Sequence, residues 1–181
     1  MVMPKGGAAI FGAVLAAVAL VVVYLAIGRS GPRPGGPGSL VGAPAPSYTL
    51  MNLDAQPDAL DRYRGHVVLM NLWASWCVPC RAEMPDLQRL YEKDRAKNLV
   101  VLGVNQGESL ERARSFAASL GIGFPILLDR NQQYGRAYTA LGLPTTIVVA
   151  PNGLVAKGFD GQLTFPEMEA AVAPLLAHPS Q

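Results

Sequence analysis

The chain contains two cysteines, Cys77 and Cys80, separated by Val78 and Pro79. A Cys-x-x-Cys pair can alternate between a dithiol and a disulfide, because the second thiol can attack a mixed disulfide formed on the first. We therefore predict a redox-active disulfide, with Cys77 as the exposed nucleophile and Cys80 as the buried resolving thiol. This chemistry needs no organic cofactor.

The pair lies between a predicted strand and a predicted helix. Residues 67–72 are apolar enough for a buried strand, and residues 81–95 repeat apolar side chains at helical spacing. Cys77 would then lie at the helix N-terminus, where unpaired N–H groups and the macrodipole stabilise a thiolate. Such positions lower a cysteine pKa from about 8.5 to roughly 3.5–7.5. Pro79 suits the first helical turn, where its missing N–H breaks no hydrogen bond.

Two other uses of the cysteine pair agree less well with the sequence. A structural disulfide across two residues would close a loop too short to stabilise the fold much. A zinc site would need further ligands, and the sequence has no second cysteine pair and no His-x-x-x-His motif, so no metal site is expected. We interpret His66 and His178 as structural or exposed.

Residues 1–27 are interpreted as a membrane anchor. Residues 8–27 form a run of twenty without a charge or a proline, and twenty helical residues span the roughly 30 Å apolar core of a bilayer. A cleaved signal peptide is the alternative, but its apolar region would be about 7–15 residues long. The flanking charges are nearly balanced. We therefore rely on the redox chemistry to place the rest of the chain outside the cytoplasm, on the periplasmic side of the cell membrane.

Residues 28–46 contain six glycines and five prolines, a composition that predicts a semi-extended tether rather than a core. Residues 47–181 would form one domain, because this length is normal for a domain with its own core. The formal net charge is +2. Since the sequence has no basic stripe, nothing indicates a nucleic-acid partner.

Strand and helix patterns alternate through this domain. Strands are expected at 48–51, 67–72, 99–104 and 125–128, and helices at 81–95, 110–120 and 131–141. A β-hairpin is expected over 145–150 and 154–159, followed by a helix at 166–176. This order predicts an α/β fold, a mixed sheet with helices on both faces.

Two blocks of sequence resemble the thioredoxin superfamily, and within it the ResA/TlpA-like membrane-anchored thiol–disulfide oxidoreductases. The first is residues 65–85, which include the cysteine pair, and the second is Gly142-Leu143-Pro144-Thr145-Thr146, similar to the cis-proline loop of that family. The likeness covers residues 42–176 and implies a thioredoxin-like sheet. An additional helix and strand between residues 107 and 128 also match the ResA/TlpA-like group.

The resemblance implies a role for a carboxylate. Cytoplasmic thioredoxins have a buried Asp, thought to assist proton transfer, where this chain has Asn71, and an Asn cannot take that role. Glu83 follows Cys80 by three residues and matches a Glu near the active site of the ResA-like group, so we expect it to handle the proton. The alternative is a helix-surface Glu facing Arg81 or Arg89.

The resemblance also implies a substrate-binding surface. A cis bond between Leu143 and Pro144 would let the loop face the cysteines and offer main-chain hydrogen bonds to an extended substrate. A proline that simply begins a strand is the alternative. The residues expected at this surface are Trp76, Pro79, Leu143, Pro144 and Thr145, whereas Trp73 is expected in the core.

The predicted function is an extracytoplasmic thiol–disulfide oxidoreductase that acts as a reductant. Its expected partners are disulfide-containing protein substrates and a membrane thiol reductant that restores the dithiol. The resemblance points to apocytochrome c or to an oxidase copper-site protein as the substrate, with the cytochrome slightly favoured.

Two other functions stay open. A copper metallochaperone could use the thiolate pair for Cu(I), although no His or Met cluster lies near the pair. A thiol peroxidase is suggested by the Ala-Pro segment at residues 43–46, which recurs in peroxiredoxin-like domains. Those enzymes share a Thr three residues before the reactive Cys, and here that residue is Ala74.

Overall fold

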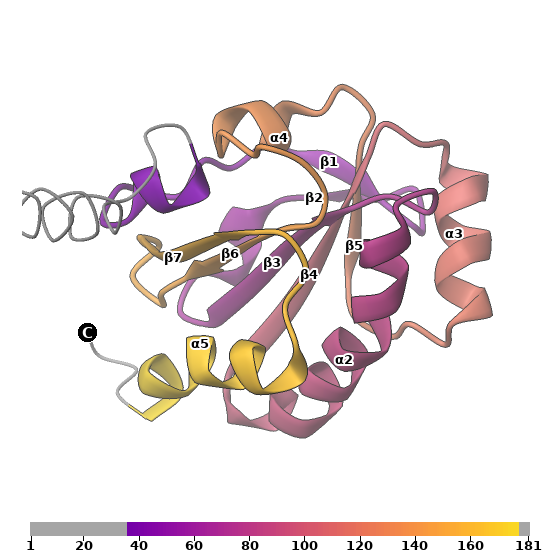
Figure 1. Ribbon diagram of the computed structural model, residues 1–181. Coiled ribbons are helices and arrows are strands. Elements are labelled where there is room, and N and C mark those ends of the chain that lie inside the picture. Colours follow the sequence, from indigo (N-terminus) through magenta and orange to yellow (C-terminus); the bar gives the residue numbers. More distant parts are fainter. Residues whose placement is uncertain (1–35, 178–181) are drawn as a thin grey trace, which may run out of the picture. The chain divides into compact units, whose positions relative to one another are not determined.

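The computed structural model describes residues 36–177 (Figure 1). The predicted anchor at residues 1–27 and the first part of the predicted tether lie outside the described residues. Within residues 36–177, no helix combines the length and the apolar character needed to cross a membrane.

A seven-stranded mixed sheet forms the centre of the fold, in the order β2-β1-β5-β4-β3-β6-β7. Strand β3 (Val67–Trp73) pairs in parallel with β4 (Leu99–Gln106) and antiparallel with β6 (Thr145–Val149). All seven residues of β3 are buried, as expected for a strand with helices packed on both faces. The remaining strands are β1 (Leu50–Asn52), β2 (Pro57–Asp58), β5 (Ile126–Asp129) and β7 (Val155–Asp160).

Helices cover both faces of the sheet (Figure 1). On one face lie α2 (Val78–Asp94), α3 (Leu110–Ser119) and α5 (Phe165–Ala177), and on the other lies α4 (Gln133–Ala137). Side chains alternate along β3, so Leu69 and Trp73 pack in the α2 layer while Met70 and Leu72 pack in the α4 layer. By the same alternation Asn71 projects into the α2 layer, which also contains Cys80.

The predicted mixed sheet with helices on both faces is confirmed. Strand β2 was not predicted, and several other elements differ from the prediction at their ends. Helix α2 begins at Val78 instead of residue 81, because Cys77 acts as its N-cap. Helix α4 covers only Gln133–Ala137 of the predicted 131–141, and Thr139 shortly after it has a φ of 51°, which helical backbone does not allow. Helix α3 begins after Ser109, whose side chain caps it by accepting a hydrogen bond from the Arg112 N–H.

Residues 36–46 pack against the domain, whereas the sequence predicts that they belong to the tether. Pro37–Leu40 form a 3-10 helix, η1, beside β7. The N–H groups of Gly42 and Ala45 donate to the carbonyls of Val155 (2.8 Å) and Gly153 (2.9 Å). The segment has few apolar residues, so its attachment through backbone hydrogen bonds leaves no hydrophobic pattern to detect.

A substitution at Gly158 of β7 would test how closely residues 36–46 pack on the domain. A Cβ at this position would lie 2.5 Å from the carbonyl carbon of Pro37 and 2.7 Å from the nitrogen of Gly38. Because both are backbone atoms, we expect Gly158→Ala to lower the free energy of unfolding by about 1–3 kcal/mol, measured by urea denaturation. Gly123→Ala is the control, since its Cβ would meet the Gln88 side chain at an ordinary 3.5 Å. Equal stability of the two variants would show that η1 does not pack tightly on β7.

Candidate active site

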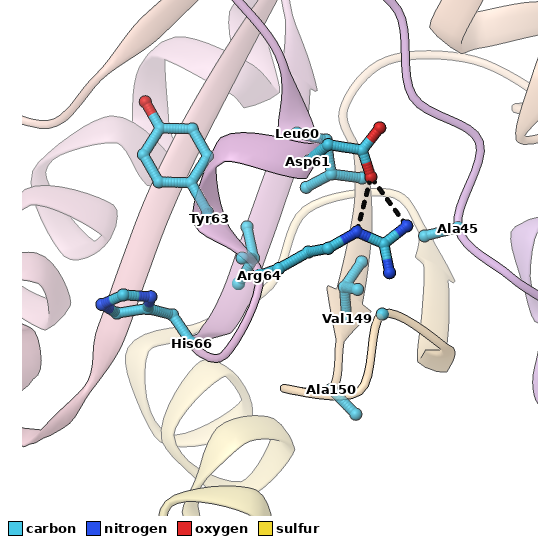
Figure 2. Close-up of a pocket in the computed structure, with 10 residues that line it drawn as sticks. Ala45, Leu60, Asp61, Tyr63, Arg64, His66, Val149 and Ala150 are labelled. Carbon is cyan, nitrogen blue, oxygen red and sulfur yellow. Dashed lines mark hydrogen bonds and ion pairs between the residues drawn. The ribbon is translucent and has the colours of Figure 1, made fainter.

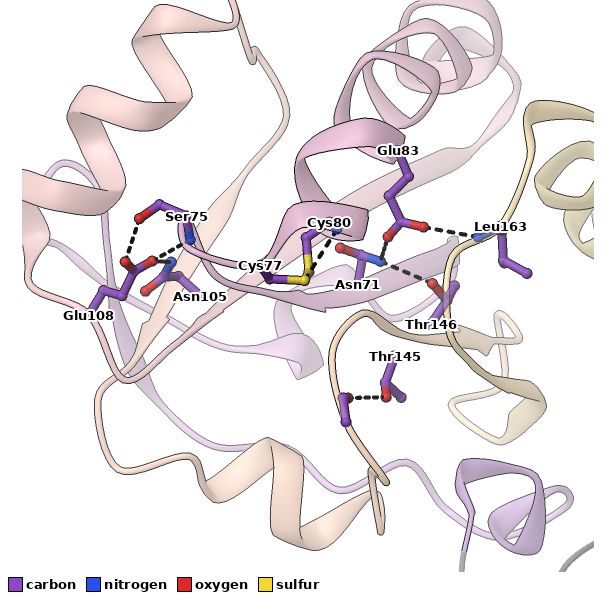
Figure 3. Close-up of a disulfide and its surroundings, with 11 residues drawn as sticks. Asn71, Ser75, Cys77, Cys80, Glu83, Asn105, Glu108, Thr145, Thr146 and Leu163 are labelled. Atoms are coloured by element: carbon purple, nitrogen blue, oxygen red, sulfur yellow. Dashed lines mark hydrogen bonds between the residues drawn. A yellow bond between two sulfur atoms is a disulfide. The ribbon is translucent and has the colours of Figure 1, made fainter.

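Cys77 and Cys80 form a disulfide at the N-terminus of α2, with their Cα atoms 5.3 Å apart (Figure 3). The Cys77 sulfur accepts a hydrogen bond from the Cys80 N–H at 3.2 Å. Cys80 has no exposed surface and Cys77 is only 4% exposed. The prediction that Cys77 is exposed is therefore wrong. As the N-cap, Cys77 has its sulfur folded back onto the first turn of α2. Cys77 is still the more accessible of the two.

Glu83 lies on the buried face of α2 and has no exposed surface. Its Oε1 accepts a hydrogen bond from Asn71 Nδ2 at 2.6 Å, and its Oε2 accepts one from the Leu163 N–H at 3.0 Å (Figure 3). Burial raises the pKa of Glu83 to about 7, although these two hydrogen bonds oppose the shift. Glu83 is therefore not the surface residue of the alternative interpretation. A carboxyl with this pKa can accept and release a proton near neutral pH.

The loop before β6 lies at the same end of the sheet as the cysteines. Thr145 pairs antiparallel with Leu72 of β3, so the residues before Thr145 lie beside those that follow β3. The Leu143–Pro144 bond is cis, as predicted. Thr145 was expected to contact substrate, but its side chain is fully buried and its Oγ1 donates to Gly142 O at 2.8 Å. Thr145 therefore shapes the loop from inside.

Apolar side chains are exposed around this end of the sheet. Trp76, Val78 and Leu141 are 63%, 75% and 65% exposed. Trp76 and Leu141 also line a groove of about 540 Å³ together with Leu143, and Arg136 is the charged residue in its lining. Such a groove can hold the side chains of an extended polypeptide near the disulfide.

The other predicted site residues occupy three different environments. Pro79 is exposed in the first turn of α2, Leu143 is half-buried, and Pro144 is buried. Trp73 is fully buried, which confirms its expected place in the core. The exposed members of the predicted set are thus Trp76, which precedes Cys77, and Pro79, which lies between the two cysteines.

Glu108 is a site residue that the sequence analysis missed. The residue is 8% exposed. Its carboxylate accepts hydrogen bonds from Ser75 N (2.7 Å), Ser75 Oγ (2.5 Å) and Asn105 Nδ2 (2.7 Å), and it pairs with Arg112 Nε at 3.0 Å. Although burial opposes ionisation, the hydrogen bonds from Ser75 and Asn105 hold the pKa of Glu108 below its usual value. Glu108 thereby fixes the backbone two residues before Cys77. Ser75 lies 33 residues away in sequence, and no motif signals this contact.

A second pocket, shown in Figure 2, has no features of a reaction centre. It lies beside the exposed His66, and its volume of about 10 Å³ corresponds to roughly one water molecule. Arg64 and Asp61 form an exposed ion pair there at 2.9 Å. Within residues 36–177, no group of three or more His, Cys, Asp or Glu residues could hold a metal ion.

A mixed sheet that presents a Cys-x-x-Cys disulfide at a helix N-terminus, next to a cis-proline loop, defines a thiol–disulfide oxidoreductase with a thioredoxin-like fold. The chain belongs to the AhpC/TSA family, whose model matches residues 41–157, and within it to the ResA-type thiol–disulfide oxidoreductases.

Comparisons with individual proteins support this assignment. The chain is 39% identical over 124 residues to the thiol-disulfide oxidoreductase ResA of Geobacillus thermodenitrificans, covering 68% of this chain and 71% of that protein. It is 33% identical over 123 residues to ResA of Bacillus subtilis, covering 68% and 69%. The predicted resemblance and the predicted enzyme class are confirmed.

Solved structures of similar proteins support the same fold and enzyme class. A DsbE-type thiol:disulfide interchange protein of Chlorobium tepidum superposes with a TM-score of 0.71 at 29% identity, covering 75% of this chain and 97% of that one. A secreted thiol-disulfide isomerase of Corynebacterium glutamicum superposes with a TM-score of 0.68 at 26% identity, covering 74% and 86%.

Glu83 should make the stability of the oxidised protein depend on pH. Its pKa is raised from 4.5 to about 7 in the folded state by burial first, with a smaller contribution from Asp86. The folded state therefore binds this proton more tightly than the unfolded state, and stability falls as pH rises across that interval. Because Glu83→Gln cannot ionise, we expect its free energy of unfolding at pH 8 to be higher than that of the wild type by about 2–3 kcal/mol. Urea unfolding at about pH 5 and pH 8 measures the difference.

Glu111→Gln, which removes an exposed carboxylate from α3, controls for the loss of one negative charge. If Glu83→Gln lost stability between the two pH values as steeply as the wild type does, another group would be responsible for the pH dependence.

Proposed function

We propose that the protein is an extracytoplasmic, membrane-anchored reductant of protein disulfides. The observation that supports this most is the position of Cys77 as the N-cap of α2, where the Cys80 N–H points at its sulfur. After reduction the same N–H and the helix dipole would favour a thiolate at Cys77. The redox group is the Cys77–Cys80 disulfide, and no organic cofactor is proposed.

The proposed reaction has two exchange steps. The Cys77 thiolate attacks one sulfur of the substrate disulfide and expels the other as a thiolate. Cys80 then loses its proton and attacks the Cys77 sulfur, which releases the second substrate sulfur as a thiolate and closes the Cys77–Cys80 disulfide. Two electrons pass to the substrate. Glu83, with a pKa of about 7, is the proposed acceptor of the Cys80 proton.

The substrate is proposed to bind as an extended segment across Trp76 and the cis-proline loop. The exposed Trp76, Val78 and Leu141 and the adjacent groove supply apolar contacts. A disulfide in an unfolded segment could approach the nearly buried Cys77, whereas a disulfide inside a folded core could not. Apolar side chains next to the substrate cysteines would therefore strengthen binding.

The proposed location and partners are supported by the sequence and by the relatives. Residues 8–27 are proposed to anchor the chain in the cell membrane, with the domain outside the cytoplasm, where disulfides persist. The Corynebacterium glutamicum relative is described as secreted, which supports this side of the membrane. A membrane thiol reductant would restore the dithiol after each turnover.

The thiol-peroxidase alternative is disfavoured by the position three residues before Cys77. Ala74 stands there, fully buried and without a hydroxyl, so it cannot donate a hydrogen bond to a peroxide. The metallochaperone alternative has less support than the reductant, because Cu(I) would need a reduced, accessible thiolate pair and Cys80 has no exposed surface.

Trapping of mixed disulfides tests the direction of attack. Cys80→Ser should accumulate disulfide-linked complexes with substrate proteins, because Cys77 can attack but nothing resolves the product. Cys77→Ser should not, since the remaining thiol is fully buried. The complexes are detected as bands on non-reducing gels that disappear with dithiothreitol. Equal trapping by both variants would contradict the assignment of Cys77 as the nucleophile.

A deletion strain tests the substrate class. We propose apocytochrome c or an oxidase copper-site protein, whose cysteines must be reduced before they accept haem or copper in an oxidising compartment. Loss of c-type cytochromes, or of oxidase activity alone, is expected, with recovery on added dithiothreitol. If both activities survived in a strain without a related gene, the substrate would be another protein, even if the mixed disulfides formed as expected.

A further inference from the structure

Asn71 is a buried site residue whose hydrogen bonds are incomplete. It has no exposed surface, and its Nδ2 donates to Glu83 Oε1 at 2.6 Å and to Thr146 Oγ1 at 3.0 Å. Its Oδ1 is buried without a hydrogen-bond partner in the described part of the chain. Turning the amide over would bring Oδ1 against the Glu83 carboxylate, so this orientation is fixed while Glu83 is ionised. Buried acceptors are rarely left unpaired without a reason.

The unpaired oxygen lies toward the cysteine pair. Asn71 projects into the layer that contains Cys80, and Cys80 precedes Glu83 by one helical turn on the buried face of α2. In Figure 3 the Asn71 oxygen points toward the disulfide, while the amide nitrogen points toward Glu83 and Thr146. A disulfide sulfur carries no proton, so Oδ1 has no donor in the oxidised enzyme. Reduction gives Cys80 an S–H group, which is such a donor.

We propose that Asn71 is a positioning residue that pairs with the Cys80 thiol in the reduced enzyme and turns its amide over when the Cys80 proton passes to Glu83. The inference rests on the proposed exchange reaction. Before the transfer, the Cys80 S–H donates to Oδ1 and Nδ2 donates to the Glu83 carboxylate. After it, Glu83 O–H donates to Oδ1 and Nδ2 donates to the Cys80 thiolate.

The step is balanced without any additional reactant. The proton leaves the Cys80 sulfur and bonds to Glu83 Oε1, and the electron pair stays on that sulfur. This pair forms the new bond to Cys77 while the bond between Cys77 and the substrate breaks. The pair of the broken bond leaves on the substrate sulfur, whose reduction matches the oxidation of the cysteine pair.

A primary amide suits this position because its oxygen and nitrogen are nearly equal in size, so the reversal moves no other heavy atom. Thr146 can follow the reversal, since its hydroxyl accepts a hydrogen bond from Nδ2 in one arrangement and donates to Oδ1 in the other. An Asp at position 71 would have no donor for the thiolate and would repel the Glu83 carboxylate. In this proposal Glu83 holds the proton, and Asn71 supplies the hydrogen-bond donor for the Cys80 thiolate.

The test titrates Cys80 in the full chain carrying Cys77→Ser and Glu83→Gln, where Cys80 is the remaining thiol. The neutral Gln side chain stands for the protonated Glu83, so that Asn71 Nδ2 can donate to the thiolate. Adding Asn71→Leu should raise the pKa of Cys80 by about one unit or more, because the thiolate loses a hydrogen-bond donor. Ultraviolet absorbance of the thiolate against pH gives the midpoint. Asn71→Asp, which keeps the side-chain shape, should also raise the pKa of Cys80. This variant replaces Asn71→Leu in the test if the Leu variant does not fold. An unchanged midpoint in a folded Asn71 variant would overturn the inference.

A matched control and a second measurement separate this role from a general loss of packing. Asn105→Leu also removes a buried amide with an unpaired Oδ1, but Asn105 donates to Glu108, so the Cys80 midpoint should stay in place. The infrared S–H stretch of Cys80 should move to higher frequency in Asn71→Leu as its hydrogen bond is lost, and an unshifted band would contradict the pairing. Neither measurement uses a protein substrate. If the Cys80 midpoint and the S–H band both shifted as expected but the protein reduced no substrate, the proposed function would be wrong and the role of Asn71 would still hold.

Discussion

The structure depends on a carboxylate buried where four elements meet. Glu83 comes from α2, its two hydrogen-bond donors come from Asn71 on β3 and from Leu163 before α5, and Asn71 also reaches Thr146 on β6. Removing either donor would leave one oxygen of this buried carboxylate without a hydrogen bond, which destabilises a protein strongly. The fold therefore keeps a destabilising group on the buried face of α2, one helical turn after Cys80. A purely structural role would be served equally well by a buried apolar side chain of similar size.

Two carboxylates near the cysteine pair have opposite environments. Glu83 is buried with two donors and its pKa rises to about 7, whereas Glu108 has contacts from Ser75, Asn105 and Arg112 that lower its pKa. Pairs of acids separated in this way divide their tasks, one exchanging protons and the other staying charged. Glu108 remains an anion that fixes the backbone before Cys77. Glu83 can change its protonation state during the reaction without disturbing that backbone.

Sequence patterns predicted the parts of this site that are local. Strand β3, helix α2 and the cysteine pair between them follow from apolar periodicity and spacing, because each depends on neighbours within a few residues. Contacts between distant segments could not be predicted in this way. The Glu108–Ser75 contact spans 33 residues, and the packing of residues 36–46 relies on backbone hydrogen bonds. The burial of Thr145 was missed because a Thr after a proline is equally compatible with an exposed loop and an inward-facing strand.

The segment from Gly107 to Leu128 contains α3, and it contacts the loop that leads from β3 to Cys77. Arg112 at the start of α3 donates to Ser75 Oγ at 3.0 Å. Further along α3, the Phe116 ring lies 5.3 Å from the ring of Trp73, and the Arg81 guanidinium lies 6.0 Å above Phe116. Since Trp73 and Ser75 lead into the N-cap of α2, any shift of α3 would be transmitted to Cys77. Helix α3 therefore supports the backbone that carries the cysteine pair, through Arg112 on Ser75 and Phe116 on Trp73.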